Sequence, residues 1–180
     1  MSGPETERQT ASLLPVAVAA WLAYLVIDFL THAVFLAPWW QGTESYWLPP
    51  AALFKMIPVA YLAFAIYATG LVWLMVRVGG PRPTLAMSLR IGAVVGLAFG
   101  STSALANYSV FPMPASMLLV WPVSVTIASL GASAAGSWTL GGPRPWRRVL
   151  AVFLTSLVLF VVGVVLQNLL VAGSATRISR

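Results

Sequence analysis

The sequence predicts an all-α membrane protein, a polytopic helical bundle of five transmembrane helices. Of the 180 residues, 59% are hydrophobic and only 8% are charged, whereas soluble domains carry about 25% charged residues. The mean hydropathy is +0.89. Five apolar stretches, each of the roughly 20 residues needed to cross a bilayer, fill most of the chain. We therefore expect one membrane domain over 13–172, between a cytoplasmic N-terminal tail of 1–12 and a C-terminal tail of 173–180.

Proline and glycine mark the limits of the first two predicted spans. The first span, 13–38, is a continuous apolar run that ends at Pro38-Trp39-Trp40. The second span, 51–78, begins directly after Pro49-Pro50, and proline suits the first turn of a helix. It ends at Gly79-Gly80-Pro81, a combination that stops helices.

The remaining three spans are bounded in the same way. The third span, 87–111, turns into the fourth, 115–139, through the short hairpin Phe111-Pro112-Met113-Pro114. The fourth span stops at Gly141-Gly142-Pro143, and the fifth covers 148–172. Helix limits read from a sequence are good to about four residues.

The distribution of basic residues predicts the orientation. One side of the membrane would hold seven arginines: Arg8, Arg77, Arg82, Arg90, Arg144, Arg147 and Arg148. The other side would hold three basic residues: Lys55, Arg177 and Arg180. Because cytoplasmic loops carry the excess of Lys and Arg, we expect a cytoplasmic N-terminus and an outside C-terminus. Nine arginines to one lysine, with many Ala, Gly and Pro, is typical of a bacterial protein, so the expected location is the cell inner membrane.

The net charge of +6 does not indicate a nucleic-acid partner. The basic residues lie between apolar runs, where membrane topology places them, and no soluble basic face exists to follow a phosphate backbone. The expected partners are membrane lipids, with a homo-oligomer or a larger membrane complex as further possibilities. The absence of cysteine excludes disulfides and thiolate metal sites in this chain.

The pentapeptide Gly-Gly-Pro-Arg-Pro occurs twice, at 79–83 and at 141–145. Both copies end a two-span hairpin on the same predicted side. One interpretation is an internal duplication, which some transporters show. The other is that both loops need a helix stop and a cytoplasmic arginine.

Small residues at a spacing of four predict close helix packing. The third span has Gly92, Gly96 and Gly100, and the fourth has Ala128, Ala132 and Gly136 beside a parallel row of serines. Such stripes let two transmembrane helices approach closely. We expect the third and fourth spans to pack on each other, with an oligomer interface as the alternative. The other three spans are bulkier, so their outer faces should meet lipid.

Asp28 and His32, the only histidine, lie four residues apart inside the first span. This spacing places both side chains on one helix face. Asp28 lies roughly 16 Å below the end of the span, near the middle of the bilayer. A charged residue there costs about 2.5–3.5 kcal/mol on insertion scales and is a functional-site candidate by default. We therefore expect its carboxylate to be paired, with His32 or with Lys55.

The other polar side chains of the spans fall in the same, outer leaflet. We predict that they line one pocket, whose residues are Asp28, His32, Lys55, Ser103, Asn107, Trp121, Gln167 and Asn168. The aromatic loop 37–50 is either an interfacial belt or a lid over this pocket. A structural Asp28–His32 or Asp28–Lys55 pair is the alternative to a functional site.

Catalytic and metal chemistry have little support in this set. One His and one Asp supply two ligands, whereas zinc sites have three or four, so neither a metal nor a haem is expected. A haem bound by His32 with Met56 or Met113 is conceivable, but nothing singles it out. A serine nucleophile lacks a second His as base and lacks a Gly-x-Ser-x-Gly turn.

Asp28-Phe-x-x-His32 with its aromatic loop, and Asn107-Tyr-Ser-Val-Phe-Pro-Met-Pro114, resemble uncharacterised families of small bacterial multi-span membrane proteins. The resemblance covers most of the chain and implies no particular activity.

Three functions are open at this point. The first is a non-enzymatic protein whose outer-leaflet pocket binds an apolar or cationic ligand, or which is an accessory subunit of a larger complex. The second is a proton- or cation-coupled secondary transporter with Asp28 as the carrier. The third is an intramembrane lipid-modifying enzyme with Asp28 and His32 as an acid–base pair.

Overall fold

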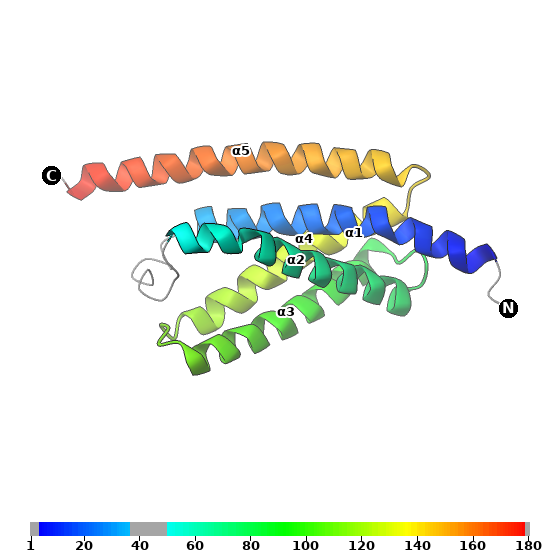
Figure 1. Cartoon of the computed structure of the whole chain (residues 1–180), viewed down its shortest axis with the longest axis horizontal. Coiled ribbons are helices and arrows are strands. Elements are labelled where there is room, and N and C mark those ends of the chain that lie inside the picture. Colours follow the sequence, from blue (N-terminus) through cyan, green and yellow to red (C-terminus); the bar gives the residue numbers. More distant parts are fainter. Residues whose placement is uncertain (1–3, 37–49, 179–180) are drawn as a thin grey trace.

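The computed structural model describes residues 4–36 and 50–178, and describes side chains within 13–36, at 52 and within 54–170. The described residues form only helices (Figure 1), which confirms the predicted all-α class. In chain order these elements are α1 (Pro4–Leu30), the π-helical turn η1 (Thr31–Phe35), α2 (Pro50–Gly79), α3 (Leu85–Val110), α4 (Met117–Leu140) and α5 (Pro145–Ile178).

Five segments of these helices are long and apolar enough to cross a membrane, so the chain is a membrane protein. They are Leu13–Phe35, Phe54–Gly79, Leu85–Val110, Met117–Leu140 and Pro145–Leu170. All five agree with the predicted spans to within a few residues.

The first and last helices extend beyond the apolar spans into the tails, because α1 already begins at Pro4 and α5 continues to Ile178. Residues 5–14 contain neither Gly nor Pro, so nothing stops the helix on the N-terminal side of the apolar run. Proline also begins α1, α2 and α5, in keeping with its preference for the first helical position.

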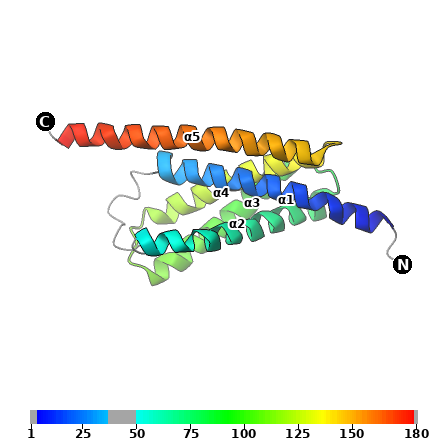
Figure 2. The same cartoon turned by 45° about the horizontal axis from the view of Figure 1, so that its top comes forward.

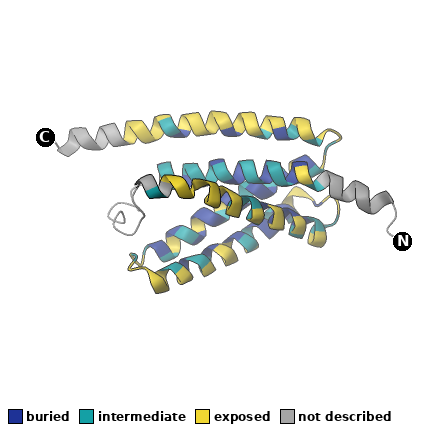
Figure 3. Ribbon diagram, in the orientation of Figure 1, coloured by how far each residue is buried: buried dark blue, intermediate teal, exposed yellow. Residues whose placement is uncertain are grey.

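The central helix of the bundle is α1, which packs on α2, α4 and α5 (Figures 1 and 2). Helix α1 is more enclosed by its neighbours than α2 and α5 are. Its alanines Ala19, Ala20 and Ala23 are buried and allow neighbouring helices to approach closely. In contrast, α5 is exposed along most of its length (Figure 3).

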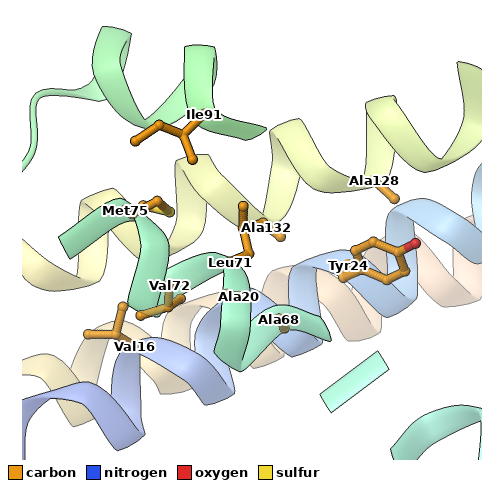
Figure 4. Close-up of a cluster of buried hydrophobic side chains, with 10 residues drawn as sticks. All are labelled: Val16, Ala20, Tyr24, Ala68, Leu71, Val72, Met75, Ile91, Ala128 and Ala132. Atoms are coloured by element: carbon orange, nitrogen blue, oxygen red, sulfur yellow. The ribbon is translucent and has the colours of Figure 1, made fainter. Parts of the chain in front are cut away.

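The core forms where α1, α2 and α4 meet (Figure 4). Tyr24 of α1 is its largest fully buried side chain, and the ring centroid of Tyr24 lies 5.1 Å from Phe64 and 5.3 Å from Tyr67, both of α2. The cluster consists of Val16, Ala20, Tyr24, Ala68, Leu71, Val72, Met75, Ile91, Ala128 and Ala132. Such packing is decisive in a bilayer, where lipid tails are as apolar as the side chains themselves.

The predicted packing of the third span on the fourth is confirmed. A β-carbon added to Gly96 would lie 2.8 Å from the Cα of Thr126, and one added to Gly100 would lie 2.7 Å from the Cα of Pro122. A β-carbon on Gly92 would lie 2.9 Å from the carbonyl oxygen of Ser129. The glycines therefore allow the two backbones to lie closer than any residue with a side chain would permit.

The row of α4 that meets these glycines is the serine row, with Ser129 and Ser133. The Ala128, Ala132 and Gly136 row faces α1 and α2 instead: the alanines belong to the core, and a β-carbon on Gly136 would lie 3.5–3.6 Å from Met75, Val16 and Val72. Both rows of α4 are thus packing surfaces, each for a different neighbour.

Candidate functional site

Asp28 and His32 contact each other near the C-terminal end of α1. The Nε2 atom of His32 lies 3.4 Å from Oδ1 of Asp28, and the side chains are 26% and 22% exposed. Between residues that the structure describes, this is the one ion pair. The predicted proximity of the carboxylate to His32 is confirmed.

A π-helical turn begins three residues after Asp28 and contains His32. The turn spans Thr31–Phe35 and is closed by the backbone N–H of Leu36, which donates to the carbonyl of Thr31 at 2.8 Å. The Thr31 hydroxyl donates to the carbonyl of Ile27 at 2.7 Å. Single π-turns inside α-helices occur frequently at functional sites. Nothing in the composition of this segment predicted the turn.

The pair occupies the side of α1 that lies between α2 and α5. At 3.6 residues per turn, Asp28 and Phe29 lie about 40° and 140° around the helix from Tyr24. Tyr24 packs on α2, whereas the ring of Phe29 lies 4.7 Å from that of Phe160 on α5. Asp28 and His32 therefore lie on the face of α1 between the contact of Tyr24 with α2 and the contact of Phe29 with α5.

That side of α1 is open because α2 and α5 both pack on α1 without packing substantially on each other, in the part of the chain that is described. Figures 1 and 2 show α1 running between them. Trp21, on the same side about two turns before Asp28, donates its Nε1–H to the carbonyl of Tyr61 on α2 at 3.1 Å. The partial exposure of Asp28 and His32 agrees with this lateral opening.

Lys55, the other predicted partner, is exposed on α2 and forms no ion pair with Asp28. Gln167 and Asn168 are exposed on α5, beyond Gly163, which packs under Phe29 and Leu30. These side chains lie toward the same end of the bundle as the pair.

Two predicted site residues on α3 bond within their own helix. The Nδ2 of Asn107 donates to the carbonyl of Ser103 at 2.9 Å. Helix α3 packs on α4 and α2 and has no comparable contact with α1, so the C-terminal end of α3 lies apart from α1 (Figure 1). Trp121 of α4 is half-buried, and its carbonyl accepts from Ser124 at 2.9 Å. The aromatic loop 37–49 lies outside the described residues.

A second polar contact joins α2 and α4 in the bundle interior. The hydroxyls of Tyr67 and Ser129 lie 2.7 Å apart, and Ser129 donates to the carbonyl of Val125 at 2.6 Å. The serine row was noted in the sequence as a packing feature, but its tyrosine partner was not. The contact is partly buried and links α2 to α4.

The arrangement can offer a cation one carboxylate and one imidazole. No three His, Asp or Glu side chains come together as metal ligands within the described residues. A carboxylate accepts about four hydrogen bonds, so the contact with His32 leaves acceptor capacity on Asp28. The chemistry available at this site is therefore cation binding or proton exchange.

Comparison of the chain with protein-family models, with curated proteins and with solved structures found no match. The fold and the site define the class of protein: an α-helical membrane protein with five membrane-crossing helices and an Asp–His pair in the first of them. What it does must be inferred from this pair and its surroundings.

Proposed function

We propose that this chain is a non-enzymatic protein of a bacterial inner membrane that binds a lipophilic cation at Asp28 and His32. One observation carries the proposal: a carboxylate in a membrane-crossing helix is paired at 3.4 Å but stays partly exposed. A purely structural pair needs no access from outside the bundle. A binding site needs the acceptor to be reachable.

The surroundings of the pair support a ligand with an apolar body. The flanking helices α2 and α5 expose mainly apolar side chains (Figure 3). A lipophilic cation entering between them would place its charge at Asp28 and its apolar part against these helices. An ionised carboxylate in a low-dielectric environment gains strongly from such a partner.

The orientation we propose puts this site in the outer leaflet. Seven of the ten basic residues lie on the side of the N-terminus and of the 79–90 and 140–148 loops, which favours a cytoplasmic N-terminus. The chain has no cysteine, so single cysteines can be introduced cleanly at the exposed positions Ser109 and Pro143. A membrane-impermeant maleimide added to intact cells should label Ser109→Cys and not Pro143→Cys. The reverse pattern would invert the orientation.

Tetraphenylphosphonium, a lipophilic cation, is a direct probe of binding. Titration into the detergent-purified protein, followed calorimetrically, should give saturable binding in the wild type that Asp28→Asn abolishes. The matched control is Asn107→Leu, which removes a polar side chain at the same end of the bundle that bonds only within α3. Equal binding by the wild type and Asp28→Asn would overturn the proposal. Native mass spectrometry of the same sample reports retained ligands and the oligomeric state.

Coupled transport is the second candidate, and the π-helical turn favours it. A π-turn adjoining the pair provides an element whose backbone hydrogen bonds can shift, as π-bulges at functional sites can. In this case Asp28 is the proton or cation carrier and His32 relays the proton. Uptake of the probe into proteoliposomes should then depend on pH and disappear in Asp28→Asn. Unchanged uptake in that variant would exclude Asp28 as the carrier.

A further inference from the structure

The repeated pentapeptides lie at one end of the bundle, opposite to Asp28. The first copy connects α2 to α3 and the second connects α4 to α5. Ser137, in the last turn of α4 before the second copy, donates its hydroxyl to the carbonyl of Pro83 in the first copy at 3.4 Å. The two loops are therefore packed at the same end, as Figure 1 also shows.

Each pentapeptide forms a tight loop that presents an exposed arginine. In the first copy Gly80 has a φ of +83°, a conformation that glycine adopts without strain. In the second, Arg148 lies over Gly142, with its guanidinium 5.1 Å from the ring centroid of Trp138 and donating to the Trp138 carbonyl. Arg82 and Arg144 themselves are exposed, and neither forms an ion pair with a described acidic side chain.

The charge at this end is strongly one-sided. The described arginines here are Arg77, Arg82, Arg90, Arg144, Arg147 and Arg148. Asp28, the one acidic residue whose side chain is described, lies toward the opposite end. Glu5 and Glu7 belong to the first turns of α1, and their side chains lie outside the described part. Six arginines thus lie toward this end of the bundle without a described acidic partner.

Exposed tryptophans place these guanidinium groups at the level of the lipid headgroups. Trp138 and Trp146 are 47% and 57% exposed and flank the second loop. Tryptophan concentrates at the interface between hydrocarbon and water. Guanidinium binds phosphate through two parallel hydrogen bonds.

We propose that the two Gly-Gly-Pro-Arg-Pro loops form a surface that binds the phosphate groups of anionic phospholipids, with Arg82 and Arg144 as the principal contacts. The charge complementarity between an arginine surface and anionic headgroups carries this assignment. This assignment explains why the pentapeptide occurs twice: each copy ends a helix and presents one guanidinium group to the lipid headgroups. The surface is independent of Asp28 and of the ligand proposed there.

The experiment measures binding of phosphatidylglycerol to the detergent-purified protein by native mass spectrometry, with phosphatidylcholine as the zwitterionic comparison. Each basic residue near an anionic membrane surface contributes a factor of about five. The double variant with Arg82→Gln and Arg144→Gln should therefore bind phosphatidylglycerol about 25-fold more weakly. The control Lys55→Gln removes an exposed basic residue at the other end of the bundle and should bind as the wild type does.

Two further comparisons separate charge from loop structure. A double variant with Arg82→Lys and Arg144→Lys keeps both charges and should retain most of the affinity, while added salt should weaken binding to the wild type. Wild-type affinity in the double Gln variant would overturn the proposal. So would an equal loss in Lys55→Gln, equal binding of phosphatidylcholine, or a Lys variant as weak as the Gln variant.

Discussion

Replacing Gly96 by alanine tests the close approach of α3 and α4. A β-carbon at this position would lie 2.8 Å from the Cα of Thr126 and 2.8 Å from the hydroxyl oxygen of Ser129. The serine hydroxyl can rotate away, but the Thr126 Cα is backbone, so the helices themselves must separate. Overpacking of this kind costs about 1–3 kcal/mol. Alanine also gains about 1 kcal/mol over glycine inside a helix, which offsets part of that cost.

A matched control isolates the packing cost. Gly70 is also inside a helix, α2, and a β-carbon there would meet no heavy atom within 4 Å. Gly70→Ala therefore gains the same helix propensity without the overlap. Both variants would be unfolded with SDS in detergent micelles and followed by circular dichroism and tryptophan fluorescence. The free energy of unfolding of Gly96→Ala should lie about 1–3 kcal/mol below that of Gly70→Ala, and equal values would refute close packing of α3 on α4.

The same unfolding assay tests three further expectations. Tyr67→Phe removes the 2.7 Å hydrogen bond to Ser129 and should cost about 0.5–1.5 kcal/mol; a variant as stable as the wild type would mean that the contact contributes nothing. Gly136→Ala adds a β-carbon at ordinary contact distance, 3.5 Å or more from its neighbours, so it should not destabilise the bundle, and a loss as large as that of Gly96→Ala would contradict the assigned role of this row. His32→Ala leaves the Asp28 carboxylate without its partner, whereas Asp28→Leu removes the charge, so His32→Ala should be the less stable of the two; the opposite order would show that the pair does not stabilise the carboxylate.

The number of helices and their limits were predictable because each depends on local sequence. An apolar run of sufficient length must cross the bilayer as a helix, and Gly79-Gly80-Pro81 and Pro112 leave little freedom about where the second and third spans stop. The spacing of four between Gly92, Gly96 and Gly100 also predicted a contact correctly, because all three glycines lie on the face of α3 that packs on α4. The proximity of Asp28 and His32 followed from helix geometry alone.

The arrangement of the helices around the site was not predictable in the same way. The serine and alanine rows of α4 are adjacent and both small, so the sequence could not decide which one meets α3. Depth in the membrane places Asn107 and Gln167 near the level of the pair, but depth does not determine the direction of a side chain. The side-chain amide of Asn107 donates to a carbonyl oxygen of its own helix. Any asparagine inside a helix can form a hydrogen bond of this kind. The π-turn at Thr31–Phe35 has no recognised sequence signal.

His32, the only histidine in the chain, allows the central claim to be tested at a single imidazole. The claim is that Asp28 and His32 act together as a cation-binding pair. Protein labelled with 15N-histidine and placed in lipid nanodiscs should give one set of ring nitrogen signals by NMR. We predict that these signals shift in Asp28→Asn, and that tetraphenylphosphonium moves them in the wild type but not in that variant. Ring signals that are the same in the wild type and Asp28→Asn, with and without the cation, would contradict the account.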